Sequence, residues 1–258
     1  MMGVHHLSKH YGGKAVLSDV SVAFPAQRVT SLIGPNGAGK STLLMAMARL
    51  LEPSSGMVQW QARDASRIPL AEYARHVATL RQSPGFNMRL TVEELVAFGR
   101  FPHSRGALTD RDRQAIDEAI AFLSLEPLRH AFIDEISGGQ RQMAFLAMTI
   151  AQQTDVLLLD EPLNNLDMKH AVQIMRALRR LCDEQGRTVV LVIHDINFAV
   201  NYSDHIVALQ NGALCFSGPA QDVVTESRMA ALYGLDFEIT RTARGCFCNY
   251  FTSREDLS

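Results

Sequence analysis

The stretch Val29-Thr-Ser-Leu-Ile-Gly-Pro-Asn-Gly-Ala-Gly-Lys-Ser41 decides the fold. Its first five residues form an apolar run typical of a buried strand, and residues 41–51 are apolar at helical spacing. Between them, Gly34–Ser41 fits the pattern GxxxxGK[ST], in which glycines let backbone N–H groups close around phosphate oxygens at a helix N-terminus. The stretch therefore predicts a phosphate-binding loop that joins a strand to a helix.

Lys40 is the loop residue placed to reach β- and γ-phosphates, and the Ser41 hydroxyl is a candidate ligand of Mg²⁺. The residues expected to surround the phosphates are Gly34, Pro35, Asn36, Gly37, Ala38, Gly39, Lys40, Ser41 and Thr42.

A second element is the apolar run Val156-Leu-Leu-Leu, which ends in Asp160 and Glu161. Two acids at the end of a buried strand are costly unless they meet a cation or water. Asp160 is expected in the shell of the Mg²⁺, and Glu161 is expected to orient or deprotonate an attacking water. Taken alone, the two acids also fit a helix N-cap pair at a strand end.

A third element is Ile136-Ser-Gly-Gly-Gln140, which leads into a predicted helix. Ser137 can cap that helix while Gly138 and Gly139 expose backbone N–H groups, which makes a second anion site.

Together and in this order, the three motifs resemble those of the ATP-binding subunit of an ABC transporter, along nearly the whole chain. The resemblance implies an α/β fold, a P-loop NTPase core with a mainly parallel sheet. The expected single ATP-binding domain also contains an N-terminal antiparallel β-subdomain and an α-helical subdomain. The α-helical subdomain carries the family's signature motif, which is Ser137–Gln140 here. We expect residues 1–85 and 151–225 to form the core with the β-subdomain, 86–150 the helical subdomain, and 226–258 a C-terminal extension.

The resemblance also implies roles for single residues, each of which would be unremarkable alone. By position, Tyr11 stacks on adenine, Gln82 senses the Mg²⁺ and the membrane partner, Asn165–Asp167 crosses a dimer interface, and His194 contacts the γ-phosphate. The signature residues touch the nucleotide held by the opposite subunit, and they are Ser137, Gly138, Gly139 and Gln140. The expected catalytic set is Glu161, His194 and Gln82, the expected metal ligands are Ser41, Gln82 and Asp160, and the expected cofactors are ATP and Mg²⁺.

The sequence departs from the family pattern at three places. Ile136 replaces the usual leucine, Ala147–Ala151 lacks an arginine often found there, and Leu163 stands where a small hydroxyl residue is common. None of these changes removes a phosphate or metal contact, so they bear only on the dimer interface.

The resemblance places the phosphate loop and the signature on opposite sides of a subunit, so a two-fold homodimer would complete two sites. It also implies integral-membrane permease subunits, coupled through the segment after Gln82, and indirectly a substrate-binding protein. A net charge of −2 argues against nucleic acid as a partner.

No apolar run approaches the roughly 18 residues of a membrane span, and residues 1–11 lack the apolar core of an export signal. We therefore expect a peripheral protein on the cytoplasmic face of the plasma membrane. Cys182, Cys215, Cys246 and Cys248 have neither zinc nor redox spacing, and we expect structural thiols. The spacing of His5, His6 and His10 includes no carboxylate or cysteine partner, which disfavours a metal site.

The segments 91–103 and 161–168 resemble ATPases that serve importers of ferric siderophores, haem and cobalamin. The expected function is therefore ATP-driven import of a ferric siderophore in bacteria. Haem, cobalamin, a metal ion or an exported solute remain as alternative substrates. A soluble translation ATPase would carry two cassettes, a chromosome ATPase would insert a long coiled coil, and a binding module without hydrolysis is disfavoured by Glu161.

Simple patterning predicts the other elements. Residues 1–33 are β-rich, with Val20, Val22 and Phe24 alternating, and residues 91–150 are helical, with Thr109 as a helix cap. Val189–Ile193 predicts a buried strand, Asn211-Gly212 predicts a hairpin turn, and residues 236–252 predict a second strand pair.

Overall fold

The computed structural model describes residues 1–81 and 89–251, so Gln82 lies outside the described residues. The chain forms two compact units. The first unit comprises Met1–Asp64 and the chain from Val192 onward, and the second comprises Ala65–Leu191.

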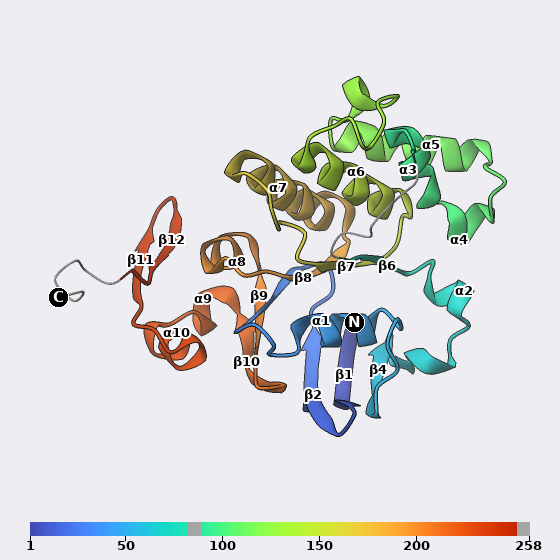
Figure 1. The fold of residues 1–258 in the computed structure, drawn as a ribbon. Coiled ribbons are helices and arrows are strands. Elements are labelled where there is room, and N and C mark those ends of the chain that lie inside the picture. The colour runs from blue at the N-terminus through green and yellow to red at the C-terminus, as the bar shows by residue number, and fades with distance from the viewer. Residues whose placement is uncertain (82–88, 252–258) are drawn as a thin grey trace. The chain divides into compact units, whose positions relative to one another are not determined.

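The first unit contains an antiparallel sheet with the strand order β2-β1-β4-β5 (Figure 1). Its strands are β1 (Met2–Tyr11), β2 (Lys14–Phe24), β4 (Ser55–Trp60) and β5 (Arg63–Asp64). In β2, Val20 and Phe24 are buried while Ser21 and Ala23 are exposed, which confirms the predicted alternation. The sheet is the β-rich N-terminal region expected from the sequence.

Three further strands of the first unit lie in the order β10-β9-β3. They are β3 (Val29–Ile33), β9 (His205–Gln210) and β10 (Ala213–Pro219), and helix α1 (Lys40–Met47) follows β3. All five residues of β3 are buried, and it pairs in parallel with β9. The turn between β9 and β10 contains Asn211 and Gly212 at φ 51° and 79°, as the hairpin prediction requires.

The end of the first unit packs against a helix through two asparagines. The elements here are α8 (Ile196–Tyr202), α9 (Ala220–Val223), α10 (Glu226–Tyr233), β11 (Glu238–Thr242) and β12 (Gly245–Asn249). Asn201 exchanges two hydrogen bonds with the backbone of Cys246, at 2.6 and 2.8 Å. Asn197 does the same with Cys248, at 3.3 and 2.7 Å. The two side chains therefore act towards β12 as a neighbouring strand would.

The second unit alternates strands with helices. Its elements are a 3₁₀ turn η1 (Ala65–Arg67), α2 (Leu70–Tyr73), β6 (Val77–Leu80), α3 (Val92–Phe98), α4 (Phe101–Ser104), α5 (Asp110–Phe122), a 3₁₀ turn η2 (Glu126–Leu128), α6 (Gly138–Ala151), β7 (Val156–Asp160), α7 (Met168–Gln185) and β8 (Thr188–Val192). The strand order is β8-β7-β6, with β6 and β7 parallel. All residues of β7 and β8 are buried, as expected for strands covered on both faces.

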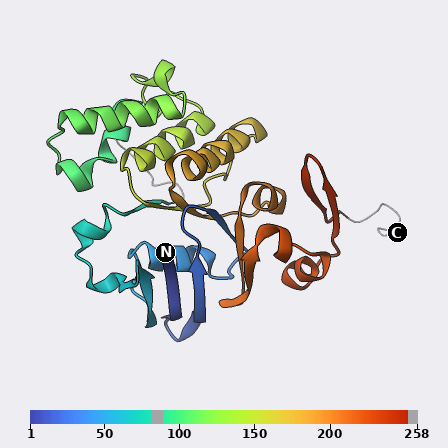
Figure 2. The same cartoon turned by 180° about the vertical axis from the view of Figure 1, so that it is seen from behind.

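Helices α3, α5 and α6 pack on one another, as the view from behind shows (Figure 2). Thr109 caps α5, and Asp112 completes the capping box predicted from the sequence. Ile116, Ile120 and Leu123 are buried, so the predicted apolar face of α5 is confirmed.

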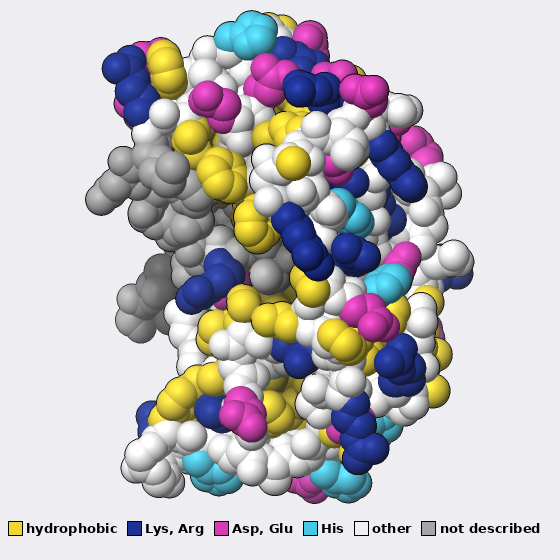
Figure 3. Space-filling model, turned by 90° about the vertical axis from the view of Figure 1, so that its right-hand side faces the viewer, with side chains coloured by type: hydrophobic (Ala, Val, Ile, Leu, Met, Phe, Trp, Pro, Cys, Tyr) yellow, Lys and Arg dark blue, Asp and Glu magenta, His cyan; other side chains and the backbone are white. Residues whose placement is uncertain are grey.

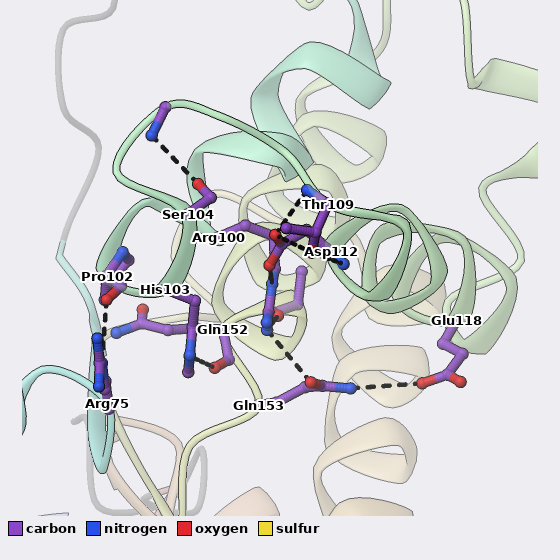
Figure 4. Close-up of polar contacts among 12 residues, drawn as sticks. Arg75, Arg100, Pro102, His103, Ser104, Thr109, Asp112, Glu118, Gln152 and Gln153 are labelled. Carbon is purple, nitrogen blue, oxygen red and sulfur yellow. Dashed lines mark hydrogen bonds and ion pairs between the residues drawn. The ribbon is translucent and has the colours of Figure 1, made fainter.

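Arg100 lies at the centre of this helical region (Figure 4). Its Nε donates to Oδ1 of Asp112 at 2.8 Å, and its Nη1 donates to the carbonyl of Ala151 at 2.7 Å and to Gln153 at 3.2 Å. The carbonyls of a final helical turn have no partner within their helix. Arg100 therefore satisfies one of these carbonyls of α6 and connects it to the start of α5.

Two details differ from the sequence-based expectations. The helix after the phosphate loop ends at Met47 rather than near Leu51, because Arg49 adopts a left-handed φ of 57° and Leu50 is exposed. Cys182 and Cys248 are buried thiols, as expected, but Cys215 is exposed. Among the described residues, no helix combines the length and apolar character needed to cross a membrane.

Candidate functional site

The predicted phosphate loop follows β3 directly, and its backbone permits only glycine at two positions. Gly34 has φ 135°, and a Cβ on it would lie 2.0 Å from the carbonyl oxygen of Leu209. Gly39 has φ 97° and precedes α1, and its Cβ would lie 2.6 Å from Leu17 Cδ2. The loop is thus held against β9 and β2 by contacts that a side chain would break.

Lys40 is the first residue of α1 and is 5% exposed. Its Nζ donates to the carbonyls of Gly34 and Pro35, at 2.8 and 2.9 Å. These bonds hold the ammonium group over the loop, where it can meet a phosphate. Backbone N–H groups at the start of α1 add positive potential on the same side.

His194 belongs to the first unit together with the phosphate loop. The N–H of Ile193 donates to the carbonyl of Leu32 at 3.2 Å, so His194 emerges beside the end of β3, the strand that leads into the loop. The carboxylate of Asp195 then caps α8 by accepting from the N–H groups of Asn197 and Phe198. The cap fixes the direction in which the exposed residue His194 leaves the strand.

Tyr11 ends β1 in the same unit and is 48% exposed. The Nζ of Lys9 lies 5.2 Å from the centre of its ring. About half of Tyr11 is thus accessible, and stacking on adenine, the role that the resemblance implies, stays a prediction.

Asp160 and Glu161 lie in the second unit, at the end of β7. Asp160 is 8% exposed, whereas Glu161 is half-buried and has a left-handed φ of 51°. The Glu161 carboxylate accepts a short hydrogen bond from the side-chain amide of Asn164. At the end of β7 the two neighbouring carboxylates thus lie in different environments, with Asp160 buried and Glu161 partly accessible to solvent.

Ser137 caps α6 in the second unit through a reciprocal pair of bonds with Gln140. The N–H of Gln140 donates to Ser137 Oγ at 3.2 Å, and the N–H of Ser137 donates to Gln140 Oε1 at 3.0 Å. Nothing lies within 4 Å of a Cβ built on Gly138. The exposed first turn of α6 is therefore open at Gly138, and an anion site there stays a prediction.

Asp167 caps α7, and its Oδ1 accepts from the N–H and from Nδ1 of His170, both at 2.8 Å. These two hydrogen bonds hold the pKa of Asp167 below its usual value, and the bond from the His170 backbone contributes more than the bond from its side chain. The family resemblance points to Asp167, but no motif in the sequence points to His170. Its spacing of three residues from a helix cap was the only available signal.

The structure thus gathers the predicted residues in two sets. Tyr11, residues 34–42 and His194 belong to the first unit, and residues 137–140, 160–161 and 167 belong to the second. Within the described residues, no group of three or more His, Cys, Asp or Glu side chains could hold a metal ion.

A family model described as ABC transporter matches residues 17–164, which is more than half of the chain. The chain belongs to the ABC transporter family. It is therefore an ATPase of that family, and the α/β fold expected from the resemblance is confirmed.

Named relatives of this ABC protein share most of its length. It is 48% identical over 239 residues to the "Petrobactin import ATP-binding protein YclP" of Bacillus subtilis (strain 168), covering 93% of this chain and 95% of the relative. It is 37% identical over 231 residues to the "Ferric enterobactin transport ATP-binding protein FepC" of Escherichia coli (strain K12), covering 89% of this chain and 85% of the relative.

Solved structures agree with the family. A dimeric ATP-binding cassette in a post-hydrolysis state, bound to ADP and Pi, superposes with a TM-score of 0.76 at 27% identity. The match covers 85% of this ABC chain and 99% of the other.

Proposed function

We propose that this chain is the ATP-hydrolysing subunit of a bacterial importer that takes up a ferric siderophore across the cytoplasmic membrane. The observation that carries the substrate class is the 48% identity to the petrobactin import protein over 93% of this chain. The ferric enterobactin relative extends the same substrate class to a second organism.

The residues present fit ATP with Mg²⁺. Ser41 in the first turn of α1 and Asp160 at the end of β7 offer the hard oxygen ligands that Mg²⁺ prefers. Bound Mg²⁺ would neutralise charge that develops on the phosphates. Gln82, the third predicted metal ligand, lies outside the described residues.

In the proposed reaction the chain's own groups bind ATP and direct the water. The loop amides and Lys40 hold the phosphates, and Tyr11 supports the adenine. Glu161 orients or deprotonates the attacking water, and His194 contacts the γ-phosphate. In P-loop ATPases most of the rate enhancement comes from such positioning and charge stabilisation.

The proposal includes a homodimer. Ser137 and Gly138 are exposed at the start of α6, where they can reach a nucleotide held by a second copy. An isologous two-fold interface uses the same patch twice and completes two such sites. ATP binding would favour the closed dimer and hydrolysis would release it, which is a two-state switch biased by a ligand.

The proposal also includes permease subunits at the membrane, with a substrate-binding protein acting indirectly. In the second unit, Leu70, Phe98 and Phe101 are 63%, 46% and 61% exposed. Nε of Arg75, just after α2, donates to the carbonyl of Pro102 at 3.2 Å, which holds α2 beside α4. Figure 3 shows hydrophobic side chains exposed on the side where α2 and α4 lie. Such an apolar surface supports docking of this peripheral protein to a permease on the cytoplasmic face.

Glu161→Gln tests the catalytic part of the proposal. Purified variant should bind Mg·ATP with wild-type affinity, lose about 100-fold or more of its phosphate release, and accumulate as a dimer in ATP. Glu184→Gln, a matched change on the exposed face of α7, should leave all three properties unchanged. Wild-type turnover by Glu161→Gln would remove Glu161 from its role.

A further inference from the structure

The side chain of His170 lies between two segments that the proposed function assigns to the dimer interface. Its Nδ1 is 2.8 Å from Oδ1 of Asp167, which also accepts the His170 N–H. The imidazole ring lies against Gly139, because a Cβ built there would come within 2.5 Å of His170 Cγ and 2.6 Å of Nδ1. His170 therefore touches the Asp167 loop and the first turn of α6 at once.

This contact is specific to the ring at position 170. Gly139 is not at a positive φ, and the three atoms nearest to a Cβ built on it all belong to the His170 imidazole, so the ring rather than backbone strain opposes a side chain there. The neighbouring Gly138 has open space around its Cβ direction. The His170 side chain is 21% exposed, so it is largely enclosed by these contacts.

We propose that His170 is a positioning residue that fixes Asp167 relative to the signature turn Ser137–Gly139 within one subunit. This inference rests on the proposed function, in which both segments act on the nucleotide of the opposite subunit. Asp167 and the signature then approach that nucleotide as one rigid group, because the imidazole donates to Asp167 and packs on Gly139. A small misplacement of groups that position a reaction lowers its rate strongly, even where they do not touch the reacting atoms.

Two substitutions of His170 separate its contact with Asp167 from its contact with Gly139, because each keeps one contact and removes the other. His170→Asn keeps a side-chain donor near the position of Nδ1 but removes the ring, and His170→Phe keeps a ring against Gly139 but removes the donor. We expect both variants to lower kcat for ATP hydrolysis, and His170→Ala to lower it by about 10- to 100-fold. Because none of the three changes a residue of the phosphate loop, the dissociation constant for Mg·ATP in the isolated subunit should stay within about twofold.

A matched control exists in the antiparallel sheet. His6 Nδ1 makes a similar contact with Asp19 Oδ1, at 2.7 Å, on the exposed surface. His6→Asn makes the same chemical change as His170→Asn in a different unit, and should leave kcat unchanged.

Gly139→Ala tests the packing directly. In the wild-type background its Cβ collides with the imidazole, so kcat should fall. In the His170→Ala background the space is open, and the further loss on adding Gly139→Ala should be much smaller. Equal losses in the two backgrounds would show that the ring does not set the position of this turn.

The deciding experiment measures kcat, ATP affinity and ATP-induced dimerisation of the full chain. For the dimerisation measurement, each variant also carries Glu161→Gln. The inference predicts lower kcat and weaker dimerisation with unchanged affinity and unfolding temperature. Wild-type kcat and dimerisation in His170→Ala would overturn it, and so would losses that merely follow a lower unfolding temperature. If wild-type protein shows no Glu161-dependent hydrolysis, the proposed function itself fails, which is a distinguishable result.

Discussion

Arg100 and Asp112 form an ion pair in which Nε and Oδ1 are 2.8 Å apart and the two side chains are only 3% and 5% exposed. The guanidinium also holds the last turn of α6, the helix that begins with the signature. Charges buried this completely depend on one another, because removing either partner leaves the other without compensation.

Asp112→Asn should therefore destabilise the protein by about 3–5 kcal/mol, measured by urea unfolding. Glu184→Gln makes the same change in an exposed pair with Arg180 on α7, and should cost about 0.5 kcal/mol or less. Similar small losses for both variants would show that the buried pair does not hold the helical region together.

Low pH should destabilise this region, because the Asp112 carboxylate becomes protonated. Hydrogen bonds from the side chain and then the backbone of Thr109, with a further contribution from Arg100, lower the pKa of Asp112 to about 2. A lowered pKa contributes stability that is present above the unfolded value near 3.8 and is lost as the pH falls through about 2. The free energy of unfolding should decline over this interval in wild type and less steeply in Asp112→Asn. Parallel pH profiles for the two proteins would contradict the assignment.

Lys40→Met should weaken binding of ATP by about 10- to 100-fold, because a charged hydrogen-bond donor to the phosphates is lost. Isothermal titration calorimetry measures this directly. Lys169→Met removes an exposed lysine from α7 and should leave the affinity unchanged. Unaltered affinity in Lys40→Met would count against the phosphate loop.

The double variant Asn197→Ala/Asn201→Ala should release the β11–β12 hairpin from α8, because it removes four hydrogen bonds to β12. Limited trypsinolysis at Arg241 and Arg244 should accelerate several-fold. Asn249→Ala, which removes a 3.5 Å contact with Glu238, serves as the control on the hairpin itself. Equal cleavage of wild type and double variant would show that the asparagines do not hold the hairpin.

The sequence predicts those parts of the fold whose signal is local. Apolar runs identified β3, β7 and β8, and the spacing of Thr109 and Asp112 identified the start of α5. The phosphate loop was predictable because its glycines and Lys40 are contiguous in the chain.

Long-range partners could not be predicted in this way. Arg100 has no local signal, because its carbonyl partner on Ala151 is 51 residues away. The pairing of Asn201 with Cys246 spans 45 residues, and asparagines on a helix usually indicate solvent or a cap. The left-handed Arg49 that ends α1 early also depends on its surroundings rather than on helix propensity.

Iron uptake from ferric siderophores tests the central claim most directly. Cells that lack this gene would be supplied with radiolabelled iron as ferric petrobactin or ferric enterobactin, and compared with cells that regain wild type or Glu161→Gln. The account predicts that deletion abolishes uptake of at least one of these siderophores, and that only wild type restores it. Undiminished uptake of both in the deletion strain, with other importers removed, would contradict it.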